Sequence, residues 1–142
     1  MSRARRQRGA TLVETAFTIL ILFLFLDAVL EFGRVYNIYQ VATNAAREGA
    51  RYAVAPQAGT MTRPNTAAIQ SYVSGFTASG GLAGASVFVN PSSQRINGIA
   101  LDYTSVTVAV PYTFVAPQLI FGSNGPGTIT VASTAEMRNE TN

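Results

Sequence analysis

The chain has 142 residues, enough for one modest domain and an anchor. It contains no cysteine and no histidine, which excludes disulfides and thiolate metal sites and removes the usual general base and the commonest metal ligand. The formal net charge of +3 comes from arginine, but four of the ten arginines precede Gly9, so no basic stripe for a nucleic acid remains in the rest of the chain.

An uninterrupted apolar segment follows this basic start. From Ala10 to Leu26 the chain reads ATLVETAFTILILFLFL, and its large apolar residues favour membrane insertion by about 5 kcal/mol in total. Glu14 and Asp27 lie near the ends of the segment, where a charge costs less than at a helix centre. Thr11 to Leu30 supplies the roughly 20 residues that cross a bilayer core. We therefore expect one membrane-spanning helix.

The arginines predict how this helix is oriented. The basic residues before the span are Arg3, Arg5, Arg6 and Arg8, whereas Arg34 beyond it is accompanied by Asp27 and Glu31. The positive-inside rule then places the N-terminus in the cytoplasm and the larger C-terminal part on the other side. An ordinary secretory signal is disfavoured, because the apolar segment is long and no clear small-x-small cleavage site follows it.

The junction between the leader and the apolar segment carries a motif. Residues 8–14 read RGATLVE, with a glutamate, Glu14, at the fifth position after Gly9. This resembles the class III signal of type IV pilins and pseudopilins. The resemblance implies that a prepilin peptidase on the cytoplasmic face cuts between Gly9 and Ala10, and that the new N-terminal amine is commonly methylated.

A longer resemblance covers most of the chain. The motif, the small-residue segment VATNAAREGARYAV (41–54), the run VTVAVPYTF (106–114) and the ending TITVASTAEMRNE (128–140) together are similar to the TadE-like pseudopilins of tight-adherence (Flp) type IV pili. Residues 56–84 are the least informative. Major pilins of this class usually carry tyrosine after the glutamate, whereas this chain has Thr15, which favours a minor pilin or pseudopilin.

The glutamate has a physical role in such a protein. A carboxylate within a bilayer is costly, so an intramembrane acid suggests a function. Cleavage after Gly9 would leave a free amine at Ala10, with which Glu14 of the same or a neighbouring subunit can pair in apolar surroundings. A slipped neighbour would leave a charge unpaired, so the pair would set the register of assembly. Alternatively, Glu14 merely reaches the headgroups of a plain anchor.

The helix is expected to continue beyond the membrane. Apolar and small residues recur at helical spacing up to Ala50, and Pro56 should end the helix, which we place at about 11–53. On its outer half, Arg47 and Arg51 share a face and Glu48 precedes Arg51 by three residues. We interpret this cluster as a solvated or ion-paired face and not as a binding site.

The remaining residues predict a second, shorter helix between flexible connections. A polar loop spans 55–64, and Asn65 can cap a helix running to about Ser74. The inner face of that helix is predicted to carry Ala68, Ile69, Tyr72 and Val73. Residues 75–84 contain four glycines without phosphate-loop spacing and are expected to form a flexible connection.

Three strand candidates follow. Ala85 to Asn90 is short, and Asn97-Gly98 could close a hairpin to a strand near Ile99 to Leu101. Residues 105–114 alternate, but Pro111 suggests an edge or a bulge. Residues 128–138 also alternate, after a turn-rich connection over 116–127. One face of the strand at 105–114 is predicted to hold Val106, Val108, Val110, Tyr112 and Phe114.

Two further side-chain interpretations belong to these strands. Tyr103, Tyr112 and Phe114 are more often packing residues than an exposed adhesive patch. Asp102, a lone carboxylate, is expected in a turn and not as a metal ligand.

These elements predict an α+β fold. A long N-terminal transmembrane helix continues into a small domain with a short helix and a three- or four-stranded antiparallel sheet, in a pilin-like arrangement. The expected parts are a leader over 1–9, the helix over 10–54 and an exported domain over 55–142.

Three functions were weighed on this basis. The leading one is a membrane-anchored pseudopilin, processed at Gly9 and Ala10, that acts through Glu14 in assembly of an adhesive pilus. Its partners would be the prepilin peptidase, other pilins and pseudopilins, and the assembly platform. It would reside in the bacterial inner membrane and, once assembled, at the cell surface. The alternative is a bitopic envelope protein whose outer domain binds a ligand or partner. An enzyme is disfavoured, and no catalytic, cofactor-binding or metal residues are predicted.

Overall fold

The computed structural model describes most of the chain, namely residues 2–57, 62–82, 84–97, 99–115, 118, 122 and 127–139. At residues 2–8, 96, 99 and 100 only the backbone is described. The predicted loop over 55–64 lies partly outside the described residues, and the predicted connection over 116–127 lies mostly outside them. The leader's arginine side chains also lie outside them.

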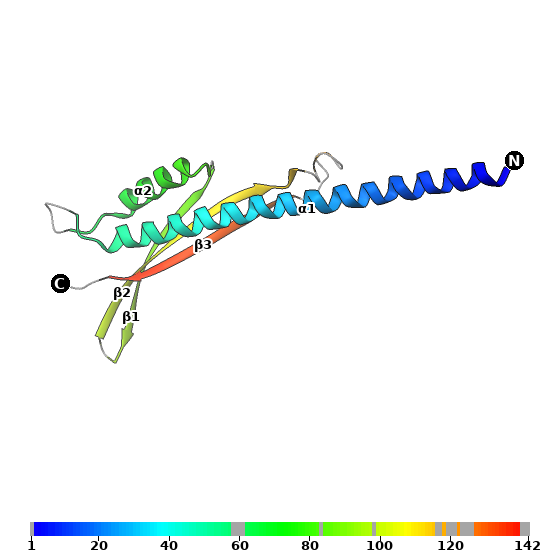
Figure 1. The fold of residues 1–142 in the computed structure, drawn as a ribbon. Coiled ribbons are helices and arrows are strands. Elements are labelled where there is room, and N and C mark those ends of the chain that lie inside the picture. The colour runs from blue at the N-terminus through cyan, green and yellow to red at the C-terminus, as the bar shows by residue number, and fades with distance from the viewer. Residues whose placement is uncertain are drawn as a thin grey trace.

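Helix α1 (Ser2–Val54) is continuous over 53 residues, and the other elements pack along one half of it (Figure 1). Its N-terminal half projects away from the other elements, and its C-terminal half lies along the sheet. The prediction of one unbroken helix through 11–53 is confirmed, although the helix also continues back through the leader. It ends two residues before Pro56, because the residue preceding a proline disfavours helical backbone.

The sheet has three antiparallel strands in the order β1-β2-β3, as predicted: β1 (Ser86–Ile96), β2 (Ile99–Thr113) and β3 (Thr128–Arg138). The hairpin between β1 and β2 is confirmed, since Ile96 pairs with Ile99 and Asn97 has a φ of 53°. The predicted separate strands near 99–101 and 105–114 are one long strand.

Two expectations about these strands were wrong. β1 does not stop at Asn90 but runs through Pro91 to Ile96, pairing with β2 along its whole length. Asp102 is not a turn residue: it pairs with Ser93 inside the sheet, and its carbonyl accepts a hydrogen bond from the Asn139 N–H at 2.7 Å. Cross-strand pairing outweighs the low intrinsic strand propensity of Asp and Pro at these positions.

Pro111 lies where β2 is paired on one side only. The ladder between β1 and β2 begins at the Ser86–Ala109 pair, whereas β3 continues along β2 past the Pro111–Thr130 pair to the Thr113–Thr128 pair. The prediction of an edge position at Pro111 is therefore confirmed locally, although β2 is the central strand. A proline without an N–H donor is tolerated at such a position.

Helix α2 (Thr66–Ser79) begins as the sequence predicted and ends later. The Asn65 side chain accepts a hydrogen bond from the Ala68 N–H at 2.8 Å, which caps the first turn. The helix does not end near Ser74 but runs to Ser79. The expectation of a flexible connection over 75–84 was therefore wrong for residues 75–79. Burial of Thr77 continues the apolar face one turn further, and a Cβ at Gly80 would lie 2.6 Å from the Val41 side chain.

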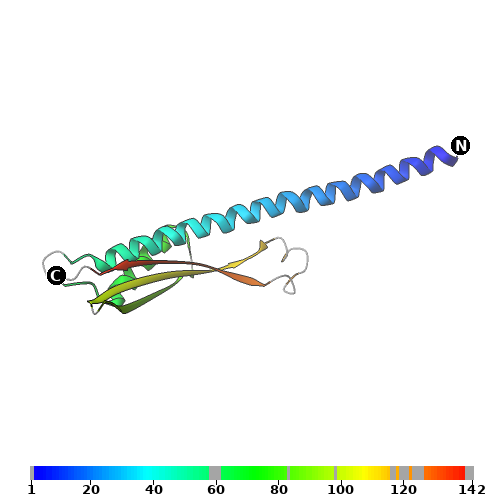
Figure 2. The same ribbon diagram turned by 90° about the horizontal axis from the view of Figure 1, so that it is seen from below.

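The core lies between this pair of helices and one face of the sheet (Figure 2). On α1 it is formed by small residues at helical spacing, on β2 by alternate valines, and on α2 by Ile69 and Val73. The predicted inner face of β2 is confirmed, because Val106, Val108, Val110 and Tyr112 are buried and Phe114 partly so. The predicted inner face of α2 holds except at Tyr72, which is 40% exposed. The small residues of α1 are Ala42, Ala45, Ala46, Gly49, Ala50 and Ala53.

Gly49 marks the closest approach of α1 to its neighbours. A Cβ at this position would overlap the Val73 side chain and lie 3.1 Å from Val106 Cγ1. Val73 and Val106 are both fully buried. Any larger residue at 49 therefore pushes α2 and β2 away from the helix.

We predict that Gly49→Ala destabilises the domain by about 1–2 kcal/mol, because overpacking outweighs the higher helix propensity of alanine. Gly33→Ala is the matched control, since a Cβ at Gly33 on the same helix meets nothing within 4 Å. Urea unfolding of the detergent-solubilised chain, followed by near-UV circular dichroism, measures both. Equal stability of the two variants would contradict the close packing at Gly49.

Candidate functional site

The N-terminal half of α1 has the character of a membrane anchor. In the described part of the chain, the helical segment Gly9–Val54 is long and apolar enough to cross a membrane, and none of its most apolar window is buried. Large apolar side chains point outward all round it, including Leu12, Phe17, Leu22, Phe25 and Leu30. A helix that is apolar on every side and packs against nothing is suited to lipid or to other helices.

The residues predicted to serve in leader cleavage and subunit assembly all lie on this bare part of α1. Gly9, Ala10 and Glu14 are exposed, and Ala10 and Glu14, four residues apart, share a face of the helix. The Glu14 carbonyl accepts a hydrogen bond from the Thr18 hydroxyl at 2.9 Å, which is local helix bonding. The structure therefore brings the Ala10 and Glu14 positions together on one face and leaves both accessible.

Gly9 makes no packing contact that requires glycine among the residues that the structure describes. A Cβ built on it meets nothing within 4 Å, and its backbone is helical. A glycine inside a helix costs about 1 kcal/mol relative to alanine. Among the described residues, therefore, neither packing nor backbone conformation calls for glycine at this position.

A second site, which the sequence did not predict, lies where α1 meets the end of the sheet. Glu31 lies directly after the predicted span and is only 5% exposed. Its carboxylate accepts hydrogen bonds from the Tyr112 hydroxyl and from the Val115 N–H, the latter at 2.7 Å. Arg34, one turn further along α1, places its guanidinium 3.7 Å from the same carboxylate. We call this cluster of Glu31, Arg34, Tyr112 and Val115 the junction.

The electrostatics of the junction follow from its burial. Burial of the Tyr112 phenol raises its pKa, and the hydrogen bond to the Glu31 carboxylate raises that pKa further. Tyr112 therefore stays protonated and keeps donating its hydrogen bond at any physiological pH. A buried carboxylate that lost this donor would be costly, so the junction fixes the end of β2 against the helix.

A sequence signal for Glu31 did exist. The packing face of α1 runs through Val35, Ile38 and Ala42, and one turn back along that face lies Glu31. An acid on an otherwise apolar helical face predicts a buried partner. From the sequence alone, Glu31 is only an acidic residue that offsets the charge of Arg34 beyond the span. Its partner, Tyr112, cannot be predicted because it is remote in sequence.

A pocket of about 450 Å³ adjoins the junction on the side of the anchor. Its described lining comes from the last turn of the predicted span, from the turn that follows, and from the ends of β2 and β3. The lining residues are Asp27, Ala28, Glu31, Phe32, Val35, Phe114 and Ile129. The end of the sheet therefore lies level with residues 27–35 of the helix.

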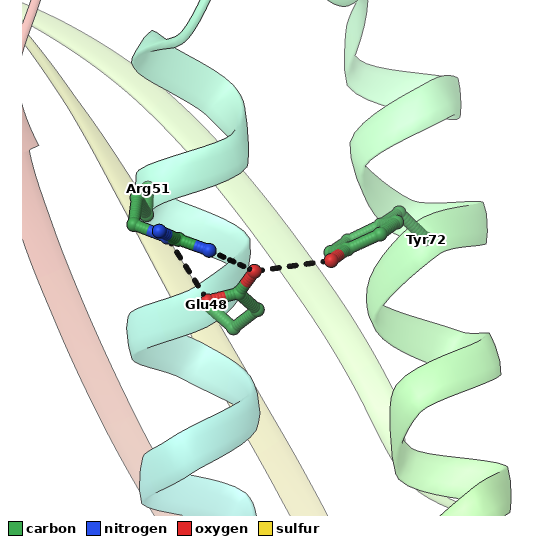
Figure 3. A network of polar contacts seen from close by, with 3 residues as sticks. All are labelled: Glu48, Arg51 and Tyr72. Atoms are coloured by element: carbon green, nitrogen blue, oxygen red, sulfur yellow. Dashed lines mark hydrogen bonds and ion pairs between the residues drawn. The ribbon is translucent and has the colours of Figure 1, made fainter.

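The charged cluster predicted on the outer half of α1 is present and is structural. The Arg51 guanidinium donates two hydrogen bonds to Glu48, at 2.9 and 3.1 Å, and the Tyr72 hydroxyl of α2 donates a third at 3.0 Å (Figure 3). The Arg51 hydrogen bonds, followed by that from Tyr72, hold the pKa of Glu48 below its usual value. The Tyr72 ring also stacks on Tyr52, with centroids 4.3 Å apart. The expectation of an ion-paired face is confirmed, and the cluster joins the two helices.

The comparison with protein families agrees with the N-terminal motif. Residues 9–51 match the family model described as TadE-like protein, so the similarity covers the anchor and most of the small-residue stripe of α1. No curated protein and no solved structure matches the chain. The matched segment begins at Gly9 and ends beside the Glu48–Arg51 pair, and thus covers both the bare half of α1 and most of its packed half.

We predict that Tyr112→Phe destabilises the domain by about 1–3 kcal/mol, because it leaves the buried Glu31 carboxylate without one of its donors. Tyr103→Phe in the same strand is the control and should change stability by less than about 0.5 kcal/mol. Thermal unfolding in detergent measures both. Equal losses would show that the hydroxyl of Tyr112 contributes nothing specific.

Proposed function

We propose that the chain is a pseudopilin of a tight-adherence pilus, processed after Gly9 and acting in pilus assembly through its N-terminal helix. The observation that carries this proposal is the TadE-like match over the helix that bears the leader motif. TadE-like proteins as a family point to involvement with Tad pili. The finer steps, processing and assembly, rest on the geometry of Gly9, Ala10 and Glu14.

Gly9 supports processing because the fold gives no other reason for it. A peptidase that cleaves after this residue must fit the backbone closely into its active site, and a glycine permits such an approach. The arginines of the leader would keep the cleavage site after Gly9 on the cytoplasmic face of the inner membrane, where a prepilin peptidase acts. The sheet and α2 would then face the opposite side.

The processing step predicts a defined mature N-terminus. In cells that make the pilus, the membrane-bound chain should begin at Ala10, and Gly9→Leu should retain the full leader. Gly33→Leu is the matched control, because both glycines lie on α1 with open space around them. Intact-mass spectrometry of the purified chain measures the result. Removal of the leader from Gly9→Leu, or its retention by the unaltered chain, would overturn the processing step.

Glu14 supports assembly because it is a carboxylate on a helix that otherwise presents apolar side chains to its surroundings. Once Ala10 carries a free amine, that amine and the Glu14 carboxylate form a complementary pair one helical turn apart. In an apolar environment such a pair attracts strongly, and an unpaired member is costly. Neighbouring pilins or pseudopilins delivered by the assembly platform would therefore pack at the one axial position that leaves no charge unpaired.

Glu14→Gln is predicted to leave insertion, processing and the outer domain intact and to abolish pilus assembly in a strain lacking the natural copy. Thr15→Ala is the control, since the Thr15 hydroxyl donates a hydrogen bond to the Thr11 carbonyl of its own helix, at 2.8 Å. Membrane fractionation measures insertion, and electron microscopy of the cell surface measures pilus assembly. Normal pili with Glu14→Gln would contradict the assembly role of Glu14.

A further inference from the structure

We propose that the anchor-side end of the sheet, formed by Phe114, Val115 and Ile129, rests in the headgroup layer of the bilayer next to Phe32. This membrane-resting surface would hold the outer domain directly on the lipid and not at the end of a free stalk. The proposal requires only that α1 is a membrane anchor and is independent of any role in a pilus.

The first step is the level of the bilayer along α1. Thr11 to Leu30 fills a hydrocarbon core of about 30 Å at 1.5 Å per residue. The headgroup layer on each side is about 5–7 Å thick, or about three to five further helical residues. On the side of the sheet this layer therefore corresponds to the turn that begins at Glu31.

The second step is that the sheet reaches this level. Phe114 and Ile129 line the same pocket as Asp27 and Ala28, which belong to the last turn of the span. The Val115 N–H is bonded to Glu31. Because these contacts join the strand ends to residues 27–31, the end of the sheet cannot lie far above the lipid while the junction is formed.

The third step is the character of the surface. Phe32 is 70% exposed, Val115 45% and Ile129 39%, and none of these side chains is charged. Arg34, two residues beyond Phe32 on α1, is 54% exposed, and its long basic side chain can reach lipid phosphates. Exposed aromatic residues followed by an arginine are typical of the interface between membrane and water.

The bilayer is the favoured occupant because this surface is continuous with the exposed apolar face of the span. The junction supplies the rigidity: Glu31 anchors both the strand end and the neighbouring loop residue, so the surface is held at a fixed height. Threonine pairs occur both at this end of the sheet, as Thr113–Thr128 at 3.0 Å, and further along it, as Thr107–Thr134 at 2.8 Å. Height along α1, and not the character of the outer face, therefore restricts the expected lipid contact to the end of the sheet at the junction.

The test uses single-cysteine labelling, which is straightforward because the chain has no cysteine of its own. Val115→Cys and Phe88→Cys carry the fluorophore NBD in the full-length chain, reconstituted at one chain per nanodisc of phosphatidylethanolamine and phosphatidylglycerol. Phe88 is the control, since it is an exposed apolar residue, 52% exposed, on the same sheet. It pairs with Thr107, about 20 Å along β2 from Thr113.

Lipid carrying a nitroxide near its headgroup should quench NBD at 115 several times more strongly than NBD at 88. Ile129→Cys should behave like Val115→Cys, which guards against a local effect of either substitution. Equal quenching at 115 and 88 would overturn the proposal. Protection of position 115 only when several chains share a disc would also overturn it, in favour of a second copy of the chain as the occupant.

Discussion

The close contact between α1 and the sheet is the constraint on which the rest of the structure depends. It is possible because the packed half of the helix carries alanines and Gly49 where it meets β2 and α2, so that backbones approach with only methyl groups and valines between them. The same helix carries large apolar residues where it meets nothing. One continuous rod therefore serves as the core of a domain over one half and as an anchor over the other.

The change between these two halves occurs at Glu31. On the anchor side of this residue the helix is bare except where Asp27 and Ala28 line the pocket with the strand ends, and on the other side one face is buried against the sheet. A carboxylate suits this position because it accepts hydrogen bonds from the Tyr112 hydroxyl and the Val115 N–H and lies 3.7 Å from the Arg34 guanidinium. The junction thus fixes the end of the domain at the point where the helix leaves the membrane.

Sequence reasoning recovered the elements whose signals are local. The unbroken helix, the Asn65 cap, the alternation of β2 and the Asn97 hairpin each follow from a few neighbouring residues. It failed where distant partners decide the structure. Asp102 and Pro91 are held in strands by cross-strand pairing, the last turn of α2 is extended by burial of Thr77, and the role of Glu31 depends on Tyr112, 81 residues away.

The candidate site divides in the same way. Gly9, Ala10 and Glu14 were found from a contiguous motif, and the TadE-like match covers the same stretch of helix. The junction and the Tyr72 contact to Glu48 were not found, because both join α1 to residues brought near it only by the fold. The motif alone does not reveal that Gly9 makes no packing contact among the described residues; this follows from the structure.

Unbroken helix from the membrane to the domain core is the central claim, and a distance between two spin labels tests it most directly. Leu12 and Asn44 are both exposed on α1, and cysteines can be introduced at both without competing thiols. In lipid, double electron–electron resonance should give one narrow distribution near 48 Å, as 32 residues of helix require. A broad or markedly shorter distribution would show a break at the membrane boundary and would contradict a rigid rod that carries anchor and domain together.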